Sequence, residues 1–163
     1  MSLDLDGKKL VICGCGNVLG GDDGFGPVVI EFLLTHYHLP THVLALKAGT
    51  SLGEILFELA FTAHRPRRLI IVDAVDCPDR QPGEVFTLPV ADLPAGKIAA
   101  FSSHQFPGGN VLQELRNYTG MEITILVAQV QNLPGTVKPG LSEPVQAAVP
   151  VAAQWLWLAI AAE

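Results

Sequence analysis

One stretch of sequence, LVICGCGNVLGGDDGFGP at residues 10–27, decides the fold of this chain. Residues 10–13 form a short apolar run that ends at glycines, which is the pattern of a buried strand. The loop at residues 14–26 holds six glycines and two aspartates, more glycine than an ordinary turn needs. Pro27 suits a first helical turn, and residues 28–35 carry an apolar helical stripe. A buried strand, a glycine loop and a helix are therefore predicted here.

The same alternation of strand and helix continues along the chain. Further strands are predicted at residues 43–46, 69–72, 84–88 and 123–129, and further helices at 51–63, 110–118 and from 144 onward. This alternation indicates an α/β fold with a largely parallel sheet, in a single domain spanning residues 1–163. Ligands of such sheets bind beyond the carboxyl ends of the strands, so polar residues in those loops are the candidates for a site.

The composition is apolar and sparsely charged for a chain of 163 residues. Apolar residues make up 49% and charged residues 16%, and the mean hydropathy is +0.37. These values exclude intrinsic disorder, and a net charge of −6 makes nucleic acid an unfavourable partner. The most apolar stretch, residues 147–162, contains Pro150 and Gln154 and is predicted to be a buried terminal helix rather than a membrane span. Three cysteines, an odd number, and no signal-peptide pattern predict a cytoplasmic protein without a disulfide framework.

The glycine loop fits a dinucleotide-binding loop poorly. Leu19 stands where the third glycine of that motif is expected, and Lys47 stands where an acidic residue is expected after the second strand. Adjacent aspartates would also repel a pyrophosphate. Asp22 can be a helix-start residue that the helix dipole favours, whereas Asp23 can project into the crevice as a carboxylate ligand.

A serine triad is a second possible site. The segment GTSLG at residues 49–53 matches the G-x-S-x-G nucleophile pattern between a strand and a helix. Ser51, Asp73 and His104 follow one another in the chain order of α/β-hydrolases. The alternative is that Ser51 caps the following helix, with Glu54 placed for a capping box.

A carboxylate–histidine metal site is a third possibility. Asp73 ends a predicted apolar strand, and His104 lies in a polar loop that enters a helix. With Asp23, these residues lie at successive strand-to-helix crossings on one rim, and two oxygen donors plus one imidazole suit a borderline divalent metal. The spacing is equally compatible with Asp73 as a helix cap or a solvated strand end, and with His104 as a loop histidine that binds no metal. The thiols Cys13, Cys15 and Cys77 lack C-x-x-C spacing, so we expect small apolar fillers, with a minor redox or metal role left open.

A set of motifs resembles the nickel–iron hydrogenase maturation endopeptidase family. The set comprises GCGNVL at residues 14–19, DDGFG at 22–26, AGT at 48–50, VDAVD at 72–76, PG at 82–83 and SHQ at 103–105. The motifs occur in the family's order and at about its spacing, and together they cover most of the chain. The resemblance implies a three-layer α/β/α sandwich with a mostly parallel sheet of about five strands.

The resemblance also implies a function. Members of this family are endopeptidases that remove a short C-terminal extension from the hydrogenase large-subunit precursor after nickel insertion. The precursor supplies the nickel as the recognition element, and no organic cofactor is implied. By motif, the family residues that contact this nickel correspond to Asp23, Asp73 and His104. The glycine-rich turns would let the backbone approach the precursor closely, and the substrate-binding residues expected there are Gly16, Asn17, Gly49 and Thr50.

Two positions depart from the family's pattern. Asp23 stands where the family often has glutamate, so its carboxylate is one methylene shorter. Lys47 and Ala48 stand where an acidic residue often precedes the Gly-Thr pair, a position associated with the choice of precursor. The resemblance therefore implies a client that differs from those of the best-known members. The DDGFG form looks closer to proteases of cytoplasmic hydrogenases, including the deazaflavin-reducing class.

A protein substrate implies a docking face of low charge near His104. We expect Trp155 and Trp157 of the terminal helix, and Phe106, to contribute apolar area to it. No membrane or nucleic-acid partner is expected. A non-enzymatic hydrogenase assembly chaperone on the same fold is the alternative function, alongside the serine hydrolase.

Overall fold

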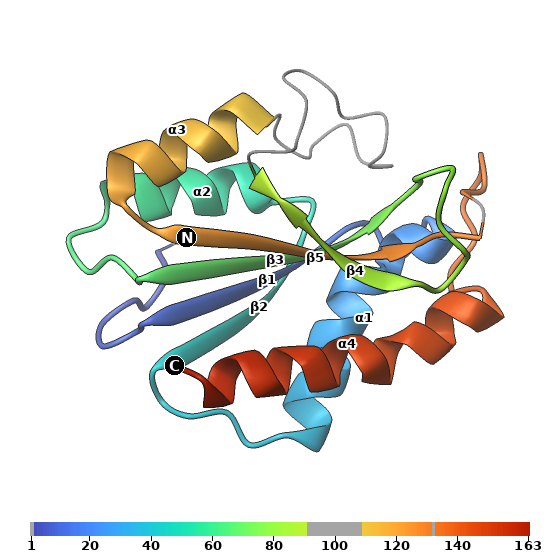
Figure 1. Cartoon of the computed structure of the whole chain (residues 1–163), viewed down its shortest axis with the longest axis horizontal. Coiled ribbons are helices and arrows are strands. Elements are labelled where there is room, and N and C mark those ends of the chain that lie inside the picture. Colours follow the sequence, from blue (N-terminus) through green and yellow to red (C-terminus); the bar gives the residue numbers. More distant parts are fainter. Residues whose placement is uncertain (1, 91–108, 132) are drawn as a thin grey trace.

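The computed structural model describes residues 2–90, 109–131 and 133–163, and a five-stranded sheet forms its centre (Figure 1). The strands are β1 (Leu10–Cys15), β2 (Val43–Gly49), β3 (Arg68–Val75), β4 (Val85–Pro89) and β5 (Glu122–Gln129). Their order across the sheet is β2-β1-β3-β5-β4. Neighbouring strands are parallel except β4 and β5, which are antiparallel. The predicted, mostly parallel sheet is confirmed.

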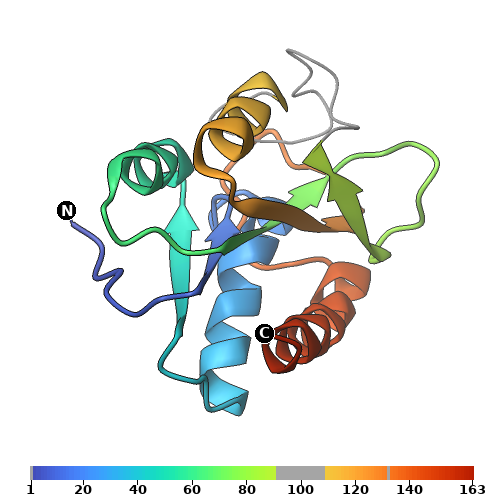
Figure 2. The same cartoon turned by 60° about the vertical axis from the view of Figure 1, so that its left-hand side comes forward.

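The helices divide between the two faces of this sheet. The helices α1 (Phe25–His36) and α4 (Glu143–Ala161) lie against each other on one face, and α2 (Leu52–Phe61) and α3 (Gly109–Thr119) cover the other (Figure 2). A short 3-10 helix, η1 (Gly21–Gly24), precedes α1. The three-layer α/β/α sandwich implied by the motifs is therefore confirmed.

The central strands are buried on both faces. Along β3, Leu69 and Ile71 pack toward α2 and α3, whereas Ile70 and Val72 pack toward α1 and α4. β1 and β5 alternate in the same way. Strands covered on both sides need apolar residues at every position, so this architecture accounts for much of the low charge of the sequence.

The terminal helix α4 belongs to the core. Its length and composition alone would allow it to cross a membrane, and it is the one helix of the described residues that meets this test. One side of it is nevertheless buried against the sheet and α1. Trp155 and Trp157 are half-buried on this core, and the ring centroids of Trp157 and Tyr37 lie 5.0 Å apart.

The tryptophans lie far from the glycine loop. Tyr37 follows the carboxyl end of α1, whereas the glycine loop precedes the amino end of that helix. The prediction that Trp155 and Trp157 extend a docking face near the site is therefore wrong, because packing of α4 against α1 holds them at the opposite end. Phe106, the other residue of that prediction, lies outside the described residues.

Two glycines bring α1 into backbone contact with the strands. A Cβ atom at Gly26 would overlap backbone atoms of Cys15 and Val72, and a Cβ atom at Gly14 would overlap the carbonyl group of Gly26. Backbone atoms cannot move aside as a flexible side chain can. Glycine is therefore required at both positions for the helix to start this close to the sheet.

The variant Gly26→Ala should lose about 3 kcal/mol or more of unfolding free energy, because the added methyl group overlaps backbone on two strands. Gly53→Ala is the matched control, since it lies in α2 and an added Cβ meets no atom within 4 Å. That control should gain up to about 1 kcal/mol. Urea denaturation of both variants measures this, and equal stability of Gly26→Ala and the wild type would contradict the packing described.

Candidate active site

The carboxyl ends of β1, β2 and β3 lie side by side and carry three loops on one rim of the sheet. The loop after β1 is the glycine loop, the turn after β2 contains Gly49 and Thr50, and the loop after β3 begins at Asp76. Parallel α/β sheets bind ligands at this rim. The loops in which the sequence predicted a site therefore lie together at this rim.

The glycine loop folds back over Asp23. Gly16 has a φ of +122°, and a Cβ atom there would overlap the carbonyl oxygen of Asp23. The backbone N–H of Asn17 donates to Asp23 Oδ2 at 2.9 Å. The side chain of Asn17 in turn accepts the N–H of Leu19 at 3.0 Å. These bonds fix the loop around a carboxylate that is 8% exposed.

Asp73 lies inside β3, not at its end. The strand continues to Val75, and Asp73 pairs with Val127 of β5 in the parallel register. The prediction that this strand ends at Asp73 is therefore wrong, because Ala74 and Val75 continue the ladder and are buried. The Asp73 side chain is 1% exposed, and its Oδ1 accepts the N–H of Ala74 at 2.8 Å.

The two carboxylates and one thiol form an electrostatically coupled group. Burial raises the pKa of Asp73 well above its ordinary value; the Ala74 hydrogen bond lowers it, and the charge of Asp23 raises it again. Burial likewise raises the pKa of Cys15, and the charges of Asp73, Cys13 and Asp23 add to this effect. Asp23 is therefore close enough to Asp73 for its charge to oppose ionisation of Asp73. A cation placed between them would stabilise both.

Asp22 has a structural role. Its carboxylate accepts hydrogen bonds from Ser142 N at 2.7 Å, Ser142 Oγ at 2.8 Å and Gln131 N at 2.9 Å, and it is 2% exposed. Ser142 is the residue before α4, so Asp22 joins the glycine loop to the start of that helix. The interpretation as a dipole-favoured helix-start residue missed these distant donors, which no local pattern reveals.

The four predicted substrate-binding residues line one pocket. Gly16, Asn17, Gly49 and Thr50 surround a volume of about 350 Å³ together with Val18, Pro27 and Lys47. The N–H of Gly16 donates to the carbonyl oxygen of Gly49 at 2.9 Å and closes the floor between the two loops. The structure therefore brings these residues together beside Asp23.

His104 lies outside the described residues, so the structure does not test its place in the predicted metal site. Within the described ranges, no group of three or more His, Cys, Asp or Glu side chains is arranged to hold a metal ion. Asp23 and Asp73 provide two carboxylates from this part of the chain. A metal bound here would need ligands from elsewhere, from residues beyond these ranges or from a substrate.

Ser51 does not stand on a nucleophile elbow. It has ordinary dihedral angles, φ −101° and ψ 18°, and in the described part of the chain only glycines have positive φ. The G-x-S-x-G elbow requires a sharp, strained turn after a strand. Ser51 is the residue before α2, as predicted, but its side chain makes no capping hydrogen bond, so the capping box with Glu54 is wrong.

The cysteines are buried or partly buried thiols. Burial raises the pKa of Cys13 to about 12, so Cys13 is a neutral thiol at physiological pH. Cys13 and Cys15 belong to the core cluster on the α2–α3 face, and Cys77 packs against it. These observations agree with the predicted role as small apolar fillers and give no support to a zinc site.

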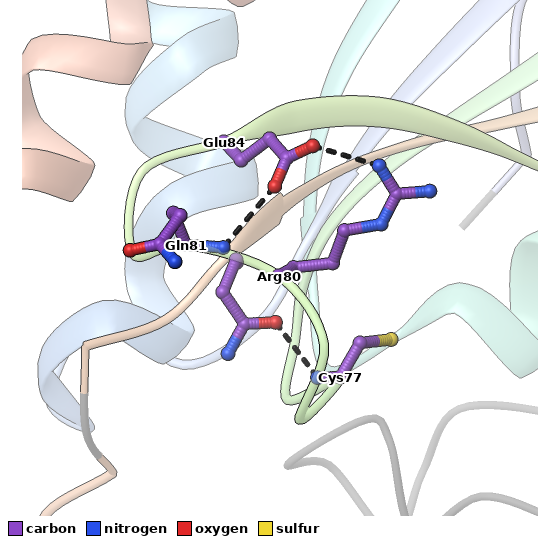
Figure 3. A network of polar contacts seen from close by, with 5 residues as sticks. Cys77, Arg80, Gln81 and Glu84 are labelled. Carbon is purple, nitrogen blue, oxygen red and sulfur yellow. Dashed lines mark hydrogen bonds and ion pairs between the residues drawn. The ribbon is translucent and has the colours of Figure 1, made fainter.

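A glutamine that the sequence reasoning overlooked holds the loop after β3. Gln129 Oε1 accepts the N–H of Cys77 at 2.7 Å, and its Nε2 donates to Asp76 Oδ1 at 3.1 Å. Further along this loop, Glu84 accepts from Arg80 at 2.7 Å and from the N–H of Gln81 at 3.1 Å (Figure 3). Gln129 is a polar residue at the end of the predicted apolar strand 123–129, and this feature of the sequence could have identified it.

The variant Asp22→Ala should lose about 2–4 kcal/mol of unfolding free energy, because it leaves the Ser142 and Gln131 donors without their carboxylate. Asp79→Ala removes an exposed carboxylate of the same size and should change stability by less than about 0.5 kcal/mol. Urea denaturation compares the two. If both variants match the wild type, Asp22 is not the anchor described.

The variant Asp73→Asn should stabilise the free protein at neutral pH. The pKa of Asp73 is raised in the folded state, so the folded state holds the proton to higher pH than the unfolded state does. The stability due to this group is full below the unfolded pKa, about 3.9, and is lost as the pH rises through the folded value. Asparagine avoids that loss, so its advantage should be on the order of 1 kcal/mol at pH 7 and vanish near pH 3. Urea titrations at both pH values measure it, and an advantage independent of pH would contradict the cause given.

Comparison with known proteins identifies the family. The sequence profile of the HycI hydrogenase maturation proteases matches residues 27–157. A candidate hydrogenase maturation protease of Methanocaldococcus jannaschii is 37% identical over 87% of this chain and 90% of its own length. Hydrogenase 2 maturation protease of Escherichia coli is 32% identical over 86% of this chain and 84% of its own. The solved Escherichia coli endopeptidase HybD superposes with a TM-score of 0.74 at 29% identity, covering 93% of this chain and 91% of that one. The chain therefore belongs to the hydrogenase maturation protease family.

Proposed function

We propose that this protein removes the C-terminal extension from the nickel-loaded precursor of a nickel–iron hydrogenase large subunit. The pair of buried carboxylates, Asp23 and Asp73, carries the proposal. Burial and the charge of Asp23 both raise the pKa of Asp73, so a cation arriving at the site would favour the charged form of Asp73. A nickel ion already held by the precursor would supply that charge as part of the substrate.

The proposed contacts to the nickel come from Asp23, Asp73 and His104. Asp23 is held by the Asn17 amide and Asp73 by the Ala74 amide, so both carboxylates are fixed before the substrate arrives. His104 must be neutral to ligate, and Asp73 must be ionised, so acid should weaken the encounter through both groups.

The nickel would orient the scissile peptide and either polarise its carbonyl group or activate a water molecule. The pocket lined by Gly16, Asn17, Gly49 and Thr50 would hold the backbone beside the bond to be cut. Glycine at two of these positions keeps side chains out of the way of the peptide. The cytoplasm is the proposed location, and neither a membrane nor a nucleic acid is a proposed partner.

The proposed client is a hydrogenase other than those of the best-known proteases. Lys47 lies beside this pocket and its ammonium group pairs with Glu31 at 2.7 Å, where the family often has an acid. One relative, 29% identical over 91% of this chain, is named as the delta subunit of the coenzyme F420 hydrogenase of Methanothermobacter thermautotrophicus. That name and the DDGFG form of the loop support a deazaflavin-reducing hydrogenase as the client.

Intact mass of the precursor after mixing with this protein tests the proposal. A nickel-loaded precursor should lose its C-terminal extension, and the nickel-free form should not. A binding chaperone would leave both masses unchanged. A serine hydrolase would instead be labelled stoichiometrically at Ser51 by a fluorophosphonate, which we do not expect.

The variants Asp73→Asn and His104→Ala should process the loaded precursor at least about 100-fold more slowly, because each removes a contact to the ion. Asp79→Asn makes the same carboxylate-to-amide change on the exposed loop after β3 and should process at the wild-type rate. Rates come from the mass assay under single-turnover conditions. Wild-type rates for Asp73→Asn or His104→Ala would refute the metal-contact assignment.

A further inference from the structure

The outer edge of β2 is open for pairing. Among the described residues, β2 pairs with β1 alone. The N–H of Leu10 donates to the carbonyl oxygen of His42, so the parallel ladder joins Leu44 and Leu46 to β1. The backbone N–H and C=O groups of Ala45 and Lys47 consequently face the outer edge. Such an edge is a template for an additional strand.

A groove of about 790 Å³ lies beside the carboxyl-terminal part of this edge. Residues 2–6, which pass outside β2 (Figure 2), form one wall, and α2 forms the other. Leu46, Lys47 and Ala48 of β2 lie between them. Phe57 and Phe61 of α2 line the groove while 69% and 67% exposed, so it offers apolar contacts to an incoming chain.

The groove continues from the proposed site. Lys47 lines both the groove and the pocket formed by Gly16, Asn17, Gly49 and Thr50. A peptide that places its scissile bond at that pocket can therefore enter the groove with the residues that follow the bond. It would pass Gly49 first and then move toward Val43, which is antiparallel to β2. The ten residues of α2 are about 15 Å long, a length that about four or five extended residues span.

The charge of the groove selects its occupant. Four carboxylates line it, those of Asp4, Asp6, Glu54 and Glu58. Lys47, which also lines the groove, pairs with Glu31 at 2.7 Å. Two of the four carboxylates have partners within the groove, since Asp6 lies 3.6 Å from His64 and Glu58 accepts the N–H of Leu3. An acidic rim around an apolar wall is complementary to a segment that alternates basic and apolar side chains.

We propose that the first four or five residues of the precursor's C-terminal extension bind as an added strand, antiparallel to β2, with basic and apolar side chains in this groove. This inference rests on the proposed function, and it specifies how the extension is recognised. Main-chain hydrogen bonds at Ala45 and Lys47 provide affinity, and the groove provides the preference for side chains.

Amide hydrogen exchange tests the added strand directly. The nickel-loaded precursor is mixed with the wild-type protein, in which all the proposed nickel contacts are present, and the amides are pulse-labelled before the precursor is shortened. Protection of the Ala45 and Lys47 amides is the expected result, without new protection along β4, the other edge of the sheet. Protection at β4, or at neither edge, would overturn the inference.

Processing kinetics test the same contacts by substitution. Ala45→Pro removes one outward N–H at an edge where proline is tolerated and should raise KM about tenfold with little change in kcat. Glu54→Lys and Phe57→Ser should also raise KM. The matched controls are Glu114→Lys in α3 and Leu158→Ser in α4. Both residues are exposed and lie outside the groove, so these variants should leave KM unchanged. Circular dichroism and urea denaturation verify that each variant folds.

A charge exchange separates this inference from the proposed function. Replacing the basic residues of the extension with glutamate should raise KM for the wild type, and Glu54→Lys should restore part of the loss. If the wild type shortens the natural precursor but no groove or extension variant changes KM, the inference fails and the proposed function stands. If the wild type shortens no nickel-loaded precursor, both fail.

Discussion

The rest of the structure depends on the backbone contact between the start of α1 and strands β1 and β3. Gly14 and Gly26 allow this contact, because any Cβ atom at either position would overlap backbone. The contact holds η1 on the rim, where Asp22 and Asp23 diverge. Asp22 reaches the start of α4 through Ser142, and Asp23 turns into the glycine loop to accept from Asn17. Asp22 thus joins the glycine loop to the terminal helix, whereas Asp23 shapes the loop itself.

The buried carboxyl group of Asp73 lowers the stability of the protein while no substrate is bound. Asp73 is buried within a central strand, and the nearby charge of Asp23 raises its pKa further. A fold optimised only for stability would place an apolar side chain there, as it does at Ile71 and Val75 on the same face of β3. Retaining a carboxylate at this position costs stability, and a cation brought by the substrate would recover it. This is the usual conflict between stability and activity at a functional site.

The two helical layers differ in how they contact the loops at the carboxyl ends of the strands. The α1–α4 layer is anchored to the glycine loop through Asp22 and keeps its tryptophans at the far end. The α2 side instead leaves Phe57 and Phe61 exposed beside an open strand edge. The turn after β2 joins that edge to the glycine pocket, since Lys47 lines both hollows. The proposed recognition of the substrate along β2 therefore depends on the position of this strand at the edge of the sheet.

The sequence by itself determined the α/β class and the order of its elements, and it predicted at which end of the sheet the candidate site lies. Buried parallel strands need unbroken apolar runs, and the glycine loop and motif order are local features. It could not decide that Asp73 lies inside β3, that Asp22 bonds to Ser142, 120 residues away, or that Gln129 holds Cys77. Nor could it show that Ser51 lacks a strained elbow or that Trp157 packs on Tyr37. Only the tertiary structure decided these, because hydrogen bonds and burial between distant segments depend on how the layers pack, and short-range residue patterns carry no record of that packing.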